Sequence, residues 1–542
     1  MVIPDKLPEN ASEPAELSIP MRDGVTLTAT LFAPPGLRQF PVILSRTPYG
    51  RGEEYGHYVS EGYGVISEDV RGRGHSGGKW EPFLNERKDG SDTVEWIAKQ
   101  PWSNGNVGMI GASYLGYVQW AAAAEHPPHL KCIVPVVSPP DPNQNLPYEN
   151  GCFLLAVSLW YTSLIGKSTP VPEATRLAPP AAYESWPISG ADVALNGTKN
   201  DVFQRWIQMD SPEDWRTGET IEDAAKINIP SLSISGWFDG DQVGTQLHWA
   251  ASHAADRWLV YGPWGHTLSV SNRVGDLEIR PGTIPNVPGL ESEFFRRFLK
   301  QDVSALSKEP HVQAFALGAN KWFKTETWPA PTATLHTLYF GADLSLRNTP
   351  SATISSRSYT MDPNHVRSSR RLRQFPLDDT EPYLLTEEDL PYGHLMFQGE
   401  VLAKPEIFGG PFTANLAFSI DTPDADFFIQ PMDAYPNGTF LPIGQGGKFR
   451  ARRFLNLPHL MGGKVYSAHL KLWDSLFQIP TGHHLAVMIS SDHCPVYALN
   501  SNTAEPMASA TRRIVTHPQI FSGSDGKQGL PASSFSFSII PQ

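Results

Sequence analysis

Residues 106–125 read NVGMIGASYLGYVQWAAAAE, and this stretch decides the fold. Its apolar run at 107–110 predicts a buried strand, and the alanine-rich run that stops before Pro127 predicts a helix. The residues between them, 111–116, allow only a sharp turn. A serine at such a turn has its hydroxyl exposed above the sheet edge, beside the positive end of the following helix. The pattern therefore predicts a nucleophile at Ser113, and the alternative is an ordinary surface serine in a βα turn.

Length, composition and charge limit the classes of function. A chain of 542 residues is expected to form about three or four domains. Its net charge is -13 and its basic residues do not cluster, which argues against nucleic acid or an anionic membrane surface as a partner. The amino-terminal residues lack a basic start and an apolar stretch, and no run is long enough to span a bilayer. We therefore expect a cytoplasmic protein that acts on a small molecule.

Strands alternate with helices in the first part of the chain. Residues 16–32 alternate apolar and polar side chains around an Arg-Asp-Gly turn, which predicts a hairpin. Residues 40–46 (FPVILSR) and 64–70 (GVISEDV) are apolar runs typical of buried strands, and residues 87–100 predict a helix. This alternation predicts a doubly wound parallel sheet. Tyr49 follows the strand at 40–46, in a loop at the strand end.

The sequence indicates neither a cofactor nor a metal. Residues 72–77 (GRGHSG) follow a strand and match GxGxxG, the fingerprint of dinucleotide binding. The next residues are Lys-Trp-Glu-Pro at 79–82, which cannot form the first turns of a helix because proline removes a donor and restricts the residue before it. The three cysteines, Cys132, Cys152 and Cys494, are too scattered for a thiolate metal site.

The βα rhythm stops after about residue 140 and then returns. Residues 141–225 mix proline-rich joints with amphipathic runs, which predicts a helical insertion. Residues 229–235 and 258–261 then predict two strands, which end in GWFDG and GPWGH. Asp239 and His266 therefore lie just past strand ends, at the edge where ligands bind in open α/β sheets. Each residue also has a purely structural interpretation. The aspartate would cap a helix, and the histidine would be a loop residue whose hydrogen bonds are made within the protein.

Together, Ser113, Asp239 and His266 follow the chain order of an α/β-hydrolase triad. A serine hydroxyl is a poor nucleophile unless a base takes its proton, and a histidine can do so near neutral pH. The aspartate would hold the tautomer of the histidine and stabilise the imidazolium. From about residue 335, short alternating segments separated by glycine, proline or aspartate are typical of a β-sandwich.

Several motifs resemble those of one enzyme family. GNVGMIGASYLG, DVRGRGHSGG, TPYG, GWFDG and GPWGH are similar to motifs of the cocaine-esterase-like hydrolases, relatives of the X-prolyl dipeptidyl aminopeptidases and the α-amino acid ester hydrolases. The resemblance spans nearly the whole chain. It implies an α/β-hydrolase core at 1–140 plus 226–334, a helical cap at 141–225 and a carboxyl-terminal β jelly-roll domain at 335–542.

The resemblance also implies the roles of the triad. Ser113 is the nucleophile, His266 the base and Asp239 its orienter. The plain GxSxG pattern expects glycine where this chain has Leu115. In this family the glycine comes one place later, where this chain has Gly116.

Further residues are assigned around the triad. The resemblance implies an oxyanion hole made of the backbone N–H of Tyr114 and the phenol of Tyr49; without it, Tyr49 would be interpreted as a turn tyrosine after proline. Aromatic residues predict an apolar lining for the substrate pocket, although a helix stripe of this kind is more often core. The candidates are Phe153, Trp160 and Trp237.

The sequence thus predicts a serine hydrolase that cleaves carboxylic esters of small molecules through an acyl-enzyme. Three alternatives stay open: an aminopeptidase that releases Xaa-Pro dipeptides, an acyltransferase that uses an amine or alcohol in place of water, and a catalytically silent binding protein. The peptidase would need an acidic pair in the cap to hold a substrate α-ammonium group. Candidate acids there are Glu149, Asp192, Asp201 and Asp210.

Overall fold

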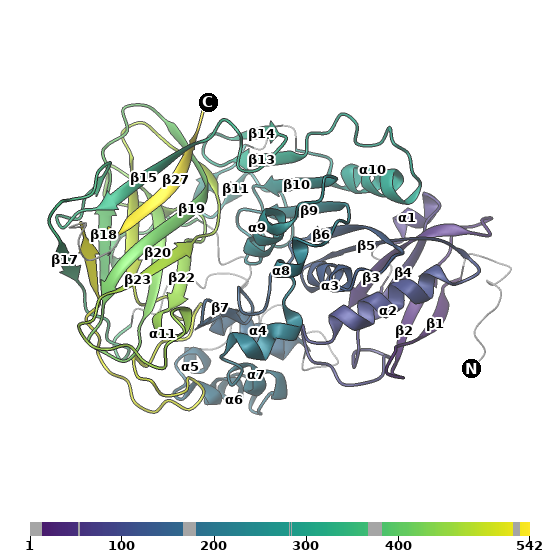
Figure 1. Ribbon diagram of the computed structural model, residues 1–542, viewed down its shortest axis with the longest axis horizontal. Coiled ribbons are helices and arrows are strands. Elements are labelled where there is room, and N and C mark those ends of the chain that lie inside the picture. The colour runs from purple at the N-terminus through teal and green to yellow at the C-terminus, as the bar shows by residue number, and fades with distance from the viewer. Residues whose placement is uncertain are drawn as a thin grey trace.

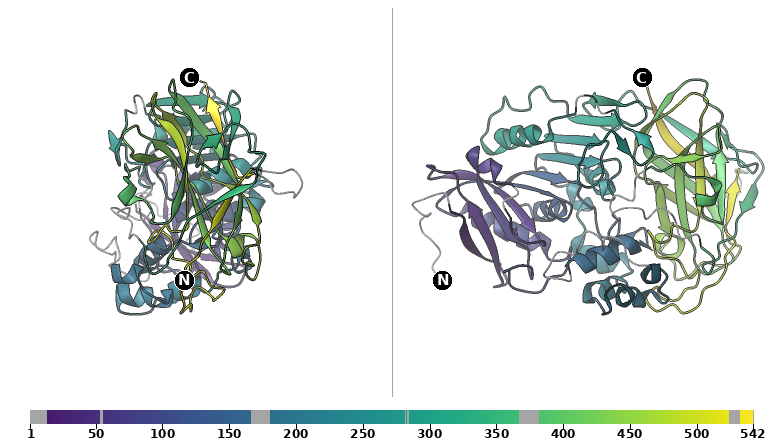
Figure 2. Two further views of the ribbon diagram at one scale, coloured as in Figure 1. Left: turned by 90° about the vertical axis from the view of Figure 1, so that its left-hand side faces the viewer. Right: turned by 180° about the vertical axis from the view of Figure 1, so that it is seen from behind.

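The computed structural model describes residues 13–52, 55–165, 180–280, 282, 284–366, 382–523 and 532–541. An α/β part and an all-β part lie side by side, and a group of short helices lies below them in the view of Figure 1. The same three parts are visible from two other sides in Figure 2. The structure therefore confirms an α/β core with a helical insertion and a carboxyl-terminal β domain.

A mixed sheet of ten strands forms the centre of the α/β part, in the order β1-β2-β4-β3-β5-β6-β9-β10-β13-β14. Neighbours from β4 to β13 in this order run parallel, whereas β1, β2 and β14 are antiparallel additions at the two edges. The strands are β1 (Ala15–Pro20), β2 (Thr26–Phe32), β3 (Phe40–Thr47), β4 (Gly64–Asp69), β5 (Ser103–Ala112), β6 (Leu130–Val136), β9 (Ser231–Gly236), β10 (Arg257–Gly262), β13 (Val312–Ala316) and β14 (Lys321–Thr325).

Helices cover both faces of this sheet. Val107 and Met109 of β5 pack with side chains of α2 and α3, whereas Ile110 packs on the other face with side chains of α1 and α10. A strand buried on both faces needs a continuous apolar run, which is why residues 107–110 read as one. The helices of the α/β part are α1 (His57–Ser60), α2 (Glu86–Ala98), α3 (Tyr114–Ala123), α9 (Gln242–Ala251) and α10 (Val287–Leu299).

The helical insertion, referred to below as the cap, connects β6 to β9. Its longest described helix, α4, is apolar on most sides, and Leu155 and Leu159 are both buried. The cap contains β7 (Tyr148–Glu149), β8 (Cys152–Phe153), α4 (Leu155–Ile165), α5 (Pro180–Tyr183), α6 (Ala191–Asn196), α7 (Asp201–Trp206) and α8 (Ile221–Ala224). None of the helices in the described part of the chain combines the length and the apolar character that a membrane span requires.

The carboxyl-terminal part is a sandwich of two antiparallel sheets around one apolar core. The larger sheet contains β15 (Thr334–Phe340), β16 (Leu346–Arg347), β17 (Ser355–Ser358), β19 (Glu406–Ser419), β23 (Tyr466–Lys471), β24 (Leu476–Ile479), β26 (Gln519–Ser522) and β27 (Ser534–Ile540). The smaller sheet contains β18 (His394–Gln398), β20 (Asp426–Ala434), β21 (Phe440–Pro442), β22 (Gly447–Arg450) and β25 (His484–Ser490). Two further elements are the hairpin of β11 (Arg273–Val274) with β12 (Leu277–Glu278), and the short helix α11 (Ala451–Phe454).

A buried ion pair joins the cap to the β-sandwich. The Glu149 carboxylate lies 3.1 Å from the Lys448 ammonium, and both side chains are almost completely buried. The same carboxylate accepts hydrogen bonds from Trp473 Nε1 (2.8 Å) and from the Tyr497 hydroxyl (2.6 Å). The ammonium lies 4.0 Å from the centre of the Trp473 ring. Glu149 therefore fixes the position of the cap on the sandwich.

Substitution of Lys448 tests this junction. Lys448→Met should lower the free energy of unfolding by about 3 kcal/mol, because it leaves a buried carboxylate without its counter-charge. Urea unfolding followed by tryptophan fluorescence measures this change. Arg347→Met removes an exposed pair with Asp343 and should leave the unfolding midpoint unchanged, because exposed pairs contribute little. A Lys448→Met midpoint equal to that of the wild type would contradict the proposed role.

Candidate active site

Ser113 occupies the turn between β5 and α3 with a strained backbone. Its φ is 62° and its ψ is -126°, a left-handed conformation that non-glycine residues rarely adopt. The Ser113 N–H donates to the carbonyl of Val136 on the neighbouring strand β6 (2.9 Å), and its carbonyl accepts from the N–H of Tyr117 in α3 (3.1 Å). Hydrogen bonds to the sheet and to the helix thus hold the serine in this conformation.

Two glycines make this turn possible. A Cβ atom on Gly111 would lie 2.4 Å from the Cβ of Leu115, so that α3 could not begin where it does. A Cβ atom on Gly116 would lie 2.8 Å from the Cβ of Ser138 and 3.0 Å from the carbonyl oxygen of Val136. The glycine that comes one place later than in GxSxG is therefore the residue at which α3 approaches the end of β6.

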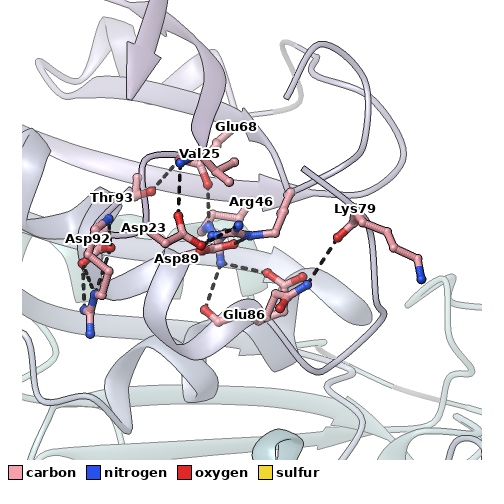
Figure 3. A network of polar contacts seen from close by, with 12 residues as sticks. Asp23, Val25, Arg46, Glu68, Lys79, Glu86, Asp89, Asp92 and Thr93 are labelled. Atoms are coloured by element: carbon pink, nitrogen blue, oxygen red, sulfur yellow. Dashed lines mark hydrogen bonds and ion pairs between the residues drawn. The ribbon is translucent and has the colours of Figure 1, made fainter. Parts of the chain in front are cut away.

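A buried polar network supports the first turn of α3. The Tyr114 hydroxyl donates to Glu86 Oε1 (2.7 Å), and the other Glu86 oxygen lies 2.9 Å from Arg46 Nη1. Arg46 Nε also donates to Glu68 (2.6 Å), as Figure 3 shows. Burial raises the pKa of both carboxyl groups, although Arg46 lowers it. The acids in turn hold the pKa of the guanidinium above its ordinary value, against the effect of burial.

Asp239 and His266 form a hydrogen-bonded pair at the ends of β9 and β10. Asp239 Oδ1 lies 2.8 Å from His266 Nδ1. The carboxylate also accepts from the Ser235 hydroxyl (3.0 Å) and from the Asp241 N–H (3.1 Å), and it is completely buried. With Nδ1 donating to the aspartate, the Nε2 atom of the imidazole carries the lone pair that a general base needs.

The sheet brings these residues to one edge. Ala112, directly before Ser113, pairs with Val136 of β6, and Gly236 of β9 pairs with Gly262 of β10. Because β5, β6, β9 and β10 are consecutive parallel neighbours, the residues that follow their carboxyl ends lie along the same edge. The topology thus brings the predicted nucleophile and the His266–Asp239 pair to one side of the sheet.

The Tyr49 hydroxyl interacts with the side chains of Tyr161 and Ser113. The residue as a whole is 46% exposed, yet burial of its hydroxyl raises its pKa, and hydrogen-bonding interactions with Tyr161 and Ser113 oppose that rise. The ring is therefore open to solvent on one side, and its polar end is directed into the protein. A phenol with a raised pKa stays neutral and can donate a hydrogen bond. This is the property required of the predicted oxyanion donor.

The second predicted donor is the backbone N–H of Tyr114. Tyr114 is the first residue of α3, where an N–H has no acceptor within its own helix. Its side chain is buried and bonded to Glu86, so only the main chain is available to a ligand. The assignment of Tyr49 and Tyr114 as an oxyanion hole stays a prediction. The arrangement of the two donors is compatible with it.

Sequence reasoning missed Asp241, a second buried carboxylate in the site. Its Oδ2 lies 4.0 Å from His266 Nδ1, and its Oδ1 accepts a long hydrogen bond from Asn145 (3.4 Å). Burial raises its pKa, His266 lowers it, and the nearby charge of Asp239 raises it further. The signal was present in GWFDGDQ, where Asp241 is two places after Asp239. Sequence spacing alone does not show that both carboxylates face one imidazole.

These acids also bear on metal binding. Among the described residues, Asp239, Asp241 and His266 are the group of possible ligands whose donor atoms lie within 4.8 Å of one another. The imidazole nitrogen in this group is already hydrogen-bonded to Asp239. A metal ion bound there would have to displace the hydrogen bond between Asp239 and His266. The arrangement therefore suits a histidine–carboxylate pair for proton transfer better than a metal site.

The predicted pocket residues are placed differently from one another. Phe153 is completely buried and its ring contacts Tyr148 and Phe203, in the core of the cap. Trp237 is also buried, stacks on Tyr261 and donates from Nε1 to the carbonyl of Phe315. These two are core residues, and the prediction that they line the pocket is not supported by their contacts.

Trp160 is placed differently from Phe153 and Trp237. It is only partly buried, and its ring centre lies 6.2 Å from that of Tyr161, the residue that interacts with the Tyr49 hydroxyl. A lining role for Trp160 stays a prediction.

Substitutions distinguish the two carboxylates. Asp239→Asn should lower kcat for a p-nitrophenyl ester by about 10⁴-fold, because the amide no longer accepts from Nδ1–H and stabilises the wrong tautomer. Asp241→Asn should keep most of its kcat, because its carboxylate is 4.0 Å from the ring nitrogen. Steady-state kinetics of both variants measures the difference. A larger loss in Asp241→Asn than in Asp239→Asn would exchange their roles.

Comparison with known proteins identifies relatives of this chain. The model of the X-Pro dipeptidyl-peptidase (S15 family) matches residues 23–268, and that of the X-Pro dipeptidyl-peptidase C-terminal non-catalytic domain matches residues 304–524. Cocaine esterase from Rhodococcus sp. (strain MB1 Bresler) is 29% identical, over 94% of this chain and 97% of its own.

Two solved structures share the fold, both at 22% identity and with a TM-score of 0.81. One is an aminopeptidase from the marine sediment archaeon Thaumarchaeota archaeon, which covers 99% of each chain. The other is an α-amino acid ester hydrolase, with 100% of this chain and 98% of that chain covered. The chain therefore belongs to the α/β-hydrolases of the cocaine-esterase and X-Pro dipeptidyl-peptidase type.

Proposed function

We propose that this protein is a serine hydrolase that cleaves carboxylic esters of small molecules through an acyl-enzyme. The observation that carries the proposal is the His266–Asp239 pair, on the same sheet edge as a serine held at a strained βα turn. The full-length similarity to a cocaine esterase supports the ester as the substrate class.

Acylation begins with proton transfer from the serine. Nε2 of His266 takes the Ser113 proton as Oγ attacks the ester carbonyl carbon, and Asp239 stabilises the imidazolium that forms. The carbonyl π electrons move to its oxygen, which becomes the oxyanion of a tetrahedral intermediate. The C–O bond to the leaving group then breaks, and the imidazolium protonates the departing alcohol. Water repeats these steps on the acyl-enzyme and releases the acid and free Ser113.

The Tyr49 phenol and the Tyr114 N–H would stabilise the oxyanion. Charge builds up on this oxygen only as the tetrahedral species forms, so donors placed for the oxyanion lower the barrier without tightening substrate binding. A neutral phenol suits this role because it brings no negative charge to the oxyanion. Burial of the Tyr49 hydroxyl favours that neutral form.

The cap acids do not support the peptidase alternative. Glu149 is paired with Lys448, and Asp210 with Arg453. Asp192 accepts from the backbone N–H groups of Val193 and Asn200 and from the Gln204 side chain. Asp201 is exposed in the first turn of α7.

Of these four candidate acids, three are therefore engaged within the protein and one faces solvent. An Xaa-Pro dipeptidyl substrate would need a carboxylate for its α-ammonium group, and three of the four already have partners within the protein. Leaving amines must also be protonated as they depart, which makes amides slower unless the cap supplies binding energy.

A panel of substrates tests the function. Rapid-quench mass spectrometry with esters should show a transient adduct on the peptide that carries Ser113, with the mass of the acyl group. Esters with apolar or aromatic acyl groups should be hydrolysed fastest, and Xaa-Pro anilides should be poor substrates. Ser113→Ala should form no adduct and lose turnover.

Other outcomes would change the assignment. Efficient release of an Xaa-Pro dipeptide would identify a peptidase. Product transferred to an added amine in preference to water would identify an acyltransferase. An absence of any adduct, together with no labelling of Ser113 by a fluorophosphonate, would identify a binding protein without catalytic activity.

A further inference from the structure

Arg73 lies in the GxGxxG-like loop after β4 and has no part in the triad. Its guanidinium Nε donates to the carbonyl of Pro48 (2.8 Å), and Nη1 donates to the carbonyl of Ile165 (2.7 Å). The guanidinium also lies over the Trp80 ring, 4.7 Å from its centre. These contacts hold one partly buried cation against three separate segments of the chain.

The two carbonyls that accept from Arg73 belong to the loop that contains Tyr49 and to the helix that contains Tyr161. Pro48 directly precedes Tyr49, and Ile165 is the last residue of α4, one turn after Tyr161. The Tyr49 phenol interacts with Tyr161 and with Ser113. A single guanidinium thus connects the loop of Tyr49 to the helix that carries Tyr161, whose phenol interacts with that of Tyr49. A cation at the carboxyl end of a helix is also favoured by the helix dipole.

Trp80 extends this connection toward the nucleophile. Its ring centre lies 6.3 Å from that of Tyr114 and 6.5 Å from that of Tyr161. The Trp80 ring, over which the Arg73 guanidinium lies, therefore packs against Tyr114 and against Tyr161 of the cap helix α4. A shift of the guanidinium would loosen the contact between the Tyr49 loop and the cap helix.

Charge distinguishes Arg73 from the other arginines nearby. Arg51 is paired with Asp69 and Glu16, and Arg71 with Asp89 and Asp23. The acceptors of the Arg73 guanidinium are instead the backbone carbonyls of Pro48 and Ile165. Its positive charge acts on the Tyr49 phenol and lowers the pKa that burial raises.

We propose that Arg73 is a positioning residue for the oxyanion-stabilising phenol of Tyr49. It fixes the Tyr49 loop against the end of α4, so that the hydroxyl is held at Ser113 before a substrate arrives. The proposal rests on the hydrolase function proposed above. It assigns to the GxGxxG-like loop a role in catalysis that needs no nucleotide.

A double-mutant cycle between Arg73 and Tyr49 tests this role. Tyr49→Phe should lower kcat for a p-nitrophenyl ester about a hundredfold with little change in KM, as loss of an oxyanion donor does. Arg73→Met should lower kcat about tenfold, because it would leave the Tyr49 hydroxyl misplaced and a misplaced donor stabilises the oxyanion less well. In the Tyr49→Phe background, Arg73→Met should cause less than about a twofold further loss, because residues that act through one contact are not additive.

Two further variants separate positioning from stability. Arg71→Met, in the same loop, removes the pairs with Asp89 and Asp23 and should lower the melting temperature while kcat stays near that of the wild type. Arg73→Lys keeps the charge, but a single ammonium lacks the fork that bonds both carbonyls, so its kcat should be intermediate. This variant also provides the test if Arg73→Met does not fold.

The outcomes for the two proposals are distinct. Two results would overturn the role of Arg73: losses of kcat that multiply fully in the double variant, or an unchanged kcat in both Arg73→Met and Arg73→Lys. In either case Ser113 would still react with a fluorophosphonate. Failure of that labelling in the wild type would instead overturn the hydrolase function.

Discussion

The backbone of Ser113 is the constraint on which the site depends. A non-glycine residue at φ 62° is unfavourable, and the surrounding contacts must hold it there. The absence of a Cβ on Gly111 and Gly116 lets α3 begin close to β5 and β6. The Tyr114–Glu86–Arg46 network then holds the first turn of α3 from below. The strain of one residue is thus supported by a buried core that takes no part in the chemistry.

The electrostatics of the site follow from its depth. Burial keeps the Tyr49 phenol neutral, and it makes ionisation of Asp241 unfavourable next to the Asp239 carboxylate. Asp239 itself accepts hydrogen bonds from the Ser235 hydroxyl and the Asp241 N–H, which hold the carboxylate in place beside His266. The result is an arrangement in which one carboxylate is hydrogen-bonded to His266 and a neutral phenol interacts with Ser113, as the proposed mechanism requires.

The sequence predicted the fold, and it placed Ser113, Asp239 and His266 after the strands that the structure shows, because these features depend on local signals. The strand, turn and helix around Ser113, the hairpin at 16–32 and the strand ends before Asp239 and His266 were all read from apolar periodicity and glycine. The contacts of single side chains were not predictable in this way. Phe153 and Trp237 are core residues although they resemble a pocket lining, because periodicity does not say which aromatic side chain meets solvent. Tyr49 was assigned only through the family resemblance, since its interaction with Ser113 joins two loops about sixty positions apart.

The central claim is that Ser113, Tyr49 and the Tyr114 N–H converge on one reacting carbonyl. A crystal structure of the protein after reaction with a p-nitrophenyl phosphonate tests it most directly, because the tetrahedral phosphorus mimics the intermediate. The account predicts a bond from Ser113 Oγ to phosphorus, with the phosphoryl oxygen about 2.7–3.1 Å from both the Tyr49 hydroxyl and the Tyr114 nitrogen. A phosphoryl oxygen that faces away from both donors, or a bond to another residue, would contradict it.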